Sequence, residues 1–65
     1  MNNQLIKLLD VKEKTSLSRS HIYALAQKGE FPNPIKLSAR SSAWLATEVQ
    51  DWIDSKIQAR NLGGN

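Results

Sequence analysis

The sequence predicts a mainly α-helical domain with a small β-hairpin, and three observations support this. Apolar residues recur at helical spacing in three stretches, near residues 9–15, 18–28 and 47–57. Between the second and third stretches, Pro32 and Pro34 force the chain into an extended course. A short alternating segment and a loop of small polar residues then follow, as in a hairpin. The 65 residues have room for one domain, over 1–65, with one small core.

Composition excludes several classes of function. The chain has no cysteine, so it can form neither a disulfide nor a thiolate metal site. One histidine cannot build a zinc site, and no catalytic triad or paired carboxylates can be assembled, so we expect no enzyme, no metal and no cofactor. No apolar run approaches the roughly 20 residues of a membrane span, and the N-terminus lacks the apolar core of a signal peptide. We therefore expect a cytoplasmic protein without a membrane partner.

The positive charge is distributed unevenly along the chain. Residues 1–45 carry seven cations against three acids, whereas residues 46–65 carry two cations against three acids. An excess of cations confined to one part of a chain indicates a surface that binds a polyanion. The alternative is a basic protein kept soluble by scattered lysines.

The first helix is expected over about residues 9–15, with Leu8 and Val11 on its apolar face. Asp10 and Glu13 also fit a capping box, which would move the start of this helix.

The second helix is expected to begin at Ser18, whose hydroxyl can accept from a backbone N–H of the first turn. Leu17 and Ile22 form a hydrophobic staple around this cap. Gly29 is expected to end the helix in a left-handed conformation. Only about residues 16–17 separate the two helices, which is the tight connection of a helix-turn-helix.

The start of this second helix carries an unusual set of side chains. A first turn built for stability alone usually carries acids, because the helix N-terminus is electropositive. Here Arg19, Ser20 and His21 follow the cap. Either this is an ordinary capped surface turn, or the helix end faces an anion. The buried stripe is expected at Ile22, Leu25 and Ala26, and the opposite face carries Ser20, Tyr23, Ala24 and Gln27, with Lys28 at its edge.

A hairpin is expected over residues 35–45. Residues 35–37 read as a first strand, residues 38–42 as a loop with Arg40 at its tip, and residues 43–45 as the returning strand.

The last helix is expected to begin at Thr47, with Gln50 completing a second capping box. Trp44 and Trp52 each lie in an apolar stripe, so we interpret them as core residues and not as stacking platforms for bases. Before the first helix, residues 5–6 are expected to be extended, and residues 61–65 should form a frayed tail. The apolar face of the last helix comprises Val49, Trp52, Ile53 and Ile57.

Four runs of residues together carry a resemblance to a known family. They read TxLSRSxIY (15–23), GxFPxPxKL (29–37), RSxxWL (40–45) and EVxxWI (48–53). With them the chain resembles the AlpA-like regulators of phages and prophages over about residues 5–57. These regulators are similar to excisionase and MerR-type winged helix-turn-helix domains. Ser16 is a departure, because the family usually has glycine in this turn, and it predicts a strained or altered turn.

The resemblance implies a winged helix-turn-helix of three helices and a two-stranded wing, which binds double-stranded DNA as a sequence-specific transcriptional regulator. The second helix, about residues 18–28, would lie in the major groove, and the wing, residues 35–45, would meet the backbone or the minor groove. The residues expected to contact DNA are Ser18, Arg19, Ser20, His21, Tyr23, Gln27, Lys28, Lys36, Arg40 and Ser41.

The chemistry of these side chains suits that role. Arginine pairs bidentately with guanine, and the small Ser20 lets the helix approach base edges closely. Arg40 suits a narrow minor groove, and Lys28 and Lys36 can neutralise phosphates. For Arg19 and for both lysines, the alternative is a solvated cation. Tyr23 would either donate to a phosphate or pack its ring on the wing.

Two other functions stay open. An excisionase-like recombination directionality factor would bind and bend attachment-site DNA, with an integrase or further copies of itself as partners. A protein-binding adaptor would instead use the basic face to dock an acidic protein. Binding that survives competitor DNA and depends steeply on salt would favour the DNA-binding functions.

Overall fold

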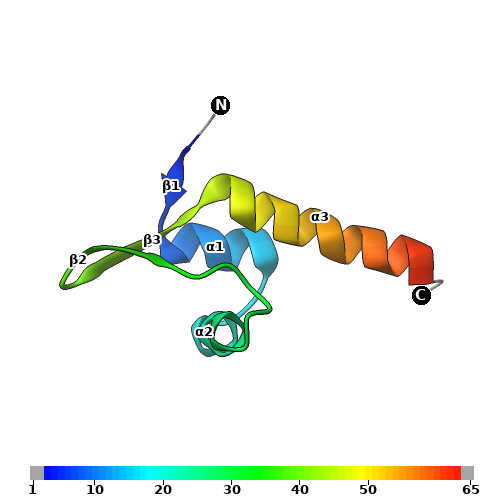
Figure 1. Ribbon diagram of the computed structural model, residues 1–65, viewed down its shortest axis with the longest axis horizontal. Coiled ribbons are helices and arrows are strands. Elements are labelled where there is room, and N and C mark those ends of the chain that lie inside the picture. The colour runs from blue at the N-terminus through cyan, green and yellow to red at the C-terminus, as the bar shows by residue number, and fades with distance from the viewer. Residues whose placement is uncertain (1–2, 64–65) are drawn as a thin grey trace.

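The computed structural model describes residues 3–63 and joins three helices to a three-stranded antiparallel sheet (Figure 1). The predicted class, mainly α with a β-hairpin wing, is confirmed. In chain order the elements are β1 (Leu5–Ile6), α1 (Leu8–Thr15), α2 (Arg19–Gln27), β2 (Ile35–Ser38), β3 (Ser41–Leu45) and α3 (Ala46–Gly63).

The turn between α1 and α2 contains the strain that the sequence predicts. Ser16 has φ 63° and ψ 17°, the left-handed conformation that favours glycine. Its backbone N–H donates to the carbonyl of Lys12 at 2.8 Å. The Thr15 hydroxyl supports the turn, because it donates to the carbonyl of Val11 at 2.7 Å and accepts from the N–H of Leu17 at 3.3 Å.

Helix α2 begins and ends as predicted. The Ser18 hydroxyl accepts from the N–H of His21 at 3.2 Å. Gly29 has φ 76°, and the N–H of Glu30 donates to the carbonyl of Leu25 at 2.9 Å, which is the Schellman closure of a helix end. Both ends of α2 are therefore fixed by hydrogen bonds.

Helix α1 begins one residue before the predicted start. Its N-cap residue is Lys7, whose side chain makes no capping hydrogen bond. Asp10 lies inside the first turn, so the alternative start at an Asp10–Glu13 capping box is wrong. An acid in the first turn stabilises the helix through its dipole instead.

The capping box predicted for α3 is wrong as well. Leu45 ends β3 and Ala46 begins α3, so the strand runs into the helix without a loop and Thr47 lies inside the helix. Gln50 turns away from the helix start, because its amide nitrogen donates to Oδ1 of Asp54 at 3.0 Å.

The far half of α3 differs from the prediction in two ways. The helix continues to Gly63 through residues expected to be a frayed tail, and positions 64 and 65 lie outside the described residues. Ile57, predicted on the buried face, is 46% exposed. In Figure 1 this half of α3 projects away from the other elements.

The sheet has strand order β1-β3-β2, so the predicted two-stranded wing gains a third strand at its base. Residues 5–6, expected to be extended, pair antiparallel with residues 44–45 of β3. The loop is shorter than predicted, because Ser41 and Ser42 belong to β3 and only the turn Ala39–Arg40 joins it to β2. The register shifts between Lys36 and Ser38, which interrupts the regular pairing of β2 with β3 there.

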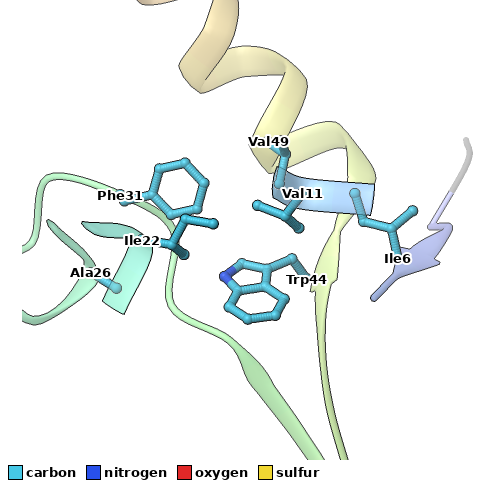
Figure 2. Packing of buried hydrophobic residues seen from close by; sticks show 7 residues of the cluster. All are labelled: Ile6, Val11, Ile22, Ala26, Phe31, Trp44 and Val49. Atoms are coloured by element: carbon cyan, nitrogen blue, oxygen red, sulfur yellow. The ribbon is translucent and has the colours of Figure 1, made fainter. Parts of the chain in front are cut away.

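The core gathers side chains from every helix and from the base of the wing (Figure 2). Trp44 is fully buried, and its indole Nε1 donates to the carbonyl of Pro32 at 3.1 Å. Trp52 is half-buried, donates to the carbonyl of Glu30 at 2.8 Å and meets Phe31 edge to face at 4.9 Å. Both tryptophans are therefore structural, and they anchor the segment between α2 and the wing. The buried cluster is Ile6, Val11, Ile22, Ala26, Phe31, Trp44 and Val49.

Candidate nucleic-acid interface

A basic depression lies between the start of α1, the start of α2 and the wing, residues 35–45. Its lining contains four cationic side chains, two serine hydroxyls and no acid. Such a lining offers charge and hydrogen-bond donors to an anion, and it holds no carboxylate for acid–base work. The four cations are Lys7, Arg19, Lys36 and Arg40.

Half of the predicted site residues meet in this depression. Those that line it are Arg19, Tyr23, Lys36, Arg40 and Ser41. The others lie outside it, on the cap and the outer face of α2, and all are exposed: Ser18, Ser20, His21, Gln27 and Lys28. The small Ala24 is exposed on the same face. The structure thus brings five of the predicted residues together in one depression and leaves the other five exposed on α2 and its caps.

Arg19 is supported by aromatic rings. Its guanidinium carbon lies 5.9 Å from the centroid of the Tyr23 ring, a cation–π distance. Tyr23 is 38% exposed, and its ring meets Trp44 with centroids 5.8 Å apart and an interplanar angle of 63°. The buried indole therefore positions Tyr23, and Tyr23 limits the positions open to Arg19.

The wing supplies one cation from a strand and one from its turn. Lys36 lies in β2 opposite Ser42, and its side chain is exposed. Arg40 occupies the tight turn Ala39–Arg40, where an exposed side chain can reach past both strands. The Ser41 hydroxyl is already engaged, because it accepts a hydrogen bond from Nζ of Lys7 at 3.0 Å.

Lys7 is the residue of the depression that sequence reasoning missed. It precedes α1 and belongs neither to α2 nor to the wing. It reaches the depression because Ile6 pairs with Trp44, which brings the start of α1 beside β3. The sequence carried one signal, which is that Lys7 directly follows the apolar residues 5–6. The sequence did not show that residues 5–6 pair with β3.

Three of the acids gather elsewhere. A second depression is lined by Glu30, Glu48 and Asp51 around Phe31 and Trp52, and it shares no lining residue with the basic one. Three of the six acids of the chain therefore lie apart from the basic depression. Among residues 3–63, no three metal-ligating side chains cluster, and no helix is long and apolar enough to cross a membrane.

Comparison with known proteins agrees with this architecture. Residues 4–57 match the family described as prophage CP4-57 regulatory protein (AlpA). The chain is also 38% identical over 60 residues to a protein of Enterobacteria phage P4 described as uncharacterized protein ORF88. That match covers 92% of this chain and 68% of the phage protein. The family match includes α1, α2, the wing and the buried half of α3, and so the chain belongs to the AlpA family of prophage regulatory proteins.

Proposed function

We propose that this protein regulates transcription of phage or prophage genes by binding double-stranded DNA at a specific sequence. The observation that carries the proposal is the convergence of Arg19, Lys36 and Arg40 on one depression that no acid lines. One of these cations begins α2 and the other two belong to the wing. A duplex that takes α2 into its major groove would therefore meet both elements at once.

The outer face of α2 suits base reading. A helix with its side chains is about 10–12 Å wide, which fits a major groove of about 12 Å. Ser20 and Ala24 are small and exposed, so the helix can approach base edges closely. Arg19 at the helix start suits the O6 and N7 acceptors of guanine, and Gln27 suits the N6 and N7 groups of adenine.

The wing suits contacts that hold the duplex without reading it directly. Lys36 lies on a strand and can neutralise a phosphate. Arg40 lies in a tight turn, and arginine is favoured in narrow minor grooves of strongly negative potential. Phosphate contacts of this kind would set the register of α2 on the duplex.

The size of the module bears on its partners. A DNA-binding module of this size buries only about 600–1,000 Å² of protein surface on DNA. We therefore propose that adequate specificity requires several sites, copies bound side by side, or a partner protein such as an integrase. Native mass spectrometry of the complex on DNA of increasing length measures the number of bound copies.

The test is selection of binding sites from a random pool of duplexes, followed by equilibrium binding to the selected and scrambled duplexes at several salt concentrations. We expect one enriched sequence, preferred over its scrambled form by a factor on the order of 10³. The logarithm of affinity should fall steeply with that of salt concentration, with a slope of about −0.9 for each phosphate contact. Enrichment of no sequence would contradict sequence-specific regulation. Absence of all DNA binding would favour an adaptor that docks an acidic protein on the same cations.

A further inference from the structure

Lys7 occupies a position in the basic depression that neither α2 nor the wing explains. It is the N-cap residue of α1, with an extended backbone (φ −84°, ψ 167°), yet its side chain does not cap the helix. Instead its Nζ donates to the Ser41 hydroxyl across the depression at 3.0 Å. The ammonium is therefore held at the wing, on the side of the molecule where Arg19, Lys36 and Arg40 converge.

The hydrogen bond leaves both partners able to bind an anion. A lysine ammonium has three N–H donors, and one of them is used on Ser41. The serine hydroxyl accepts this bond and keeps its own O–H as a donor. Lys7 and Ser41 can therefore donate to one anion together.

The backbone beside Lys7 adds to the positive potential. The first hydrogen bond of α1 runs from the N–H of Val11 to the carbonyl of Lys7 at 3.1 Å. The N–H groups of Leu8 and Leu9 precede that bond, and both residues line the depression. The start of α1 therefore places the positive end of its helix dipole beside the four cations.

We propose that the depression is a phosphate-binding site whose principal ligand is Lys7, with Ser41 as the residue that positions it. The inference rests on the proposed function, because the phosphate it assigns belongs to the DNA backbone. In that arrangement α1, α2 and the wing all contact the duplex. Lys7 would hold the backbone of one DNA strand between α2 and the wing. Free inorganic phosphate has the same chemistry and is the second possible source.

The first arm compares Lys7→Met with Lys12→Met, using the selected duplex from 50 to 200 mM salt. Methionine keeps the apolar stem and removes the charge. Lys12 is a matched control, because it is an exposed lysine of α1 that does not line the depression. We expect Lys7→Met to lower the magnitude of the salt slope by about 0.9. The ratio of wild-type affinity to variant affinity should then fall by about 3.5-fold from 50 to 200 mM salt. Lys12→Met should leave the slope unchanged, and circular dichroism melts check that both variants are folded.

The second arm finds the phosphate. Each phosphate of the duplex is replaced in turn by a neutral methylphosphonate. For the wild type, we expect one position to weaken binding in a way that Lys7→Met abolishes and Lys12→Met preserves. Ser41→Ala should weaken binding of the wild type more than it weakens binding of Lys7→Met, as expected of a residue that positions Lys7 and also donates to the same phosphate.

The third arm separates the two sources of phosphate. Sodium phosphate is titrated against sodium chloride of equal ionic strength, and amide shifts are followed by NMR. Saturable shifts at residues 7–9 and 41 that disappear in Lys7→Met would support a site for the free anion also. Their absence, with the methylphosphonate coupling present, would support a site for DNA phosphate alone.

The outcomes distinguish this inference from the proposed function. If the wild type binds the selected duplex and Lys7→Met has the same salt slope and methylphosphonate profile, the Lys7 site is wrong and the DNA-binding function stands. If the wild type binds no duplex, the proposed function fails, and the DNA phosphate assigned to Lys7 fails with it.

Discussion

The ring of Tyr23 meets the buried indole of Trp44 at an angle of 63°, with centroids 5.8 Å apart. One ring lies in the core and the other on the face proposed to bind DNA. Because Arg19 lies 5.9 Å from the same tyrosine ring, Tyr23 connects the Arg19 side chain to the core indole.

Two substitutions at Tyr23 separate its ring from its hydroxyl. Tyr23→Phe keeps the contact with Trp44, so stability should change little. If the hydroxyl donates to a phosphate, this variant should bind the selected and scrambled duplexes more weakly by similar factors. Tyr23→Ala also removes the ring, which we expect to cost an additional 0.5–1.5 kcal/mol or so of stability beyond the buried area lost. Urea unfolding and equilibrium binding measure both effects, and wild-type affinity in Tyr23→Phe would restrict Tyr23 to its packing role.

Removal of the core indole should nearly unfold the domain. Trp44→Ala removes a fully buried ring and the hydrogen bond that its indole donates to the carbonyl of Pro32. The expected loss is about 3–5 kcal/mol, much of the stability available to a domain of this size. Trp44→Phe is the milder control, because it keeps a ring in the site. A sharp urea transition of Trp44→Ala with little change in midpoint would contradict the importance of this contact.

Arg19 and Lys36 should differ in what they contribute to DNA binding. If Arg19 contacts a base, Arg19→Ala should cost about 1–3 kcal/mol on the selected duplex and relax preference at one base pair. Lys36→Ala should weaken binding to selected and scrambled duplexes alike and lower the salt slope by about 0.9. Equilibrium binding to both duplexes at several salt concentrations is the measurement. Equal losses on both duplexes for Arg19→Ala would make Arg19 a phosphate contact. Base reading would then move to Ser20, His21, Ala24 or Gln27.

Ser16 and Gly29, which have left-handed backbone, should respond to substitution with opposite signs. Ser16→Gly relieves strain at φ 63° but gives the unfolded chain more freedom, so we expect a net gain of up to about 1 kcal/mol. Gly29→Ala should cost about 1 kcal/mol from backbone strain, since no atom lies within 4 Å of the added methyl group. Chemical denaturation of both variants tests the pair. Destabilisation by Ser16→Gly would mean that the serine makes a compensating contribution.

The features predicted correctly depend on short-range signals. A few neighbouring residues determine each of these features, which are the cap at Ser18, the helix end at Gly29 and the hairpin after Pro32 and Pro34. The sequence also predicted that α2 and the wing each carry cations, because these residues lie within the two segments themselves.

The features that were missed depend on distant parts of the chain. Strand β1 is only two residues long, and it is a strand because it pairs with residues 44–45. That pairing decides where Lys7 lies, so the fourth cation of the depression could not be found from local pattern. Thr47 and Gln50 match a capping box, but α3 begins at Ala46, so Thr47 lies inside the helix and not at its cap.

The direct passage from Leu45 in β3 to Ala46 in α3 has a mechanical consequence. With no linker at this junction, and with Trp44 fixed in the core beside it, the base of the wing has no hinge. Bending is then confined to the far end, at the register shift before Ser38 and the turn Ala39–Arg40. If the protein binds DNA as proposed, we expect a wing with this fixed base to adjust little to a groove that is too wide or too narrow. We expect the wing to favour DNA whose groove width already matches the distance from α2 to the wing tip.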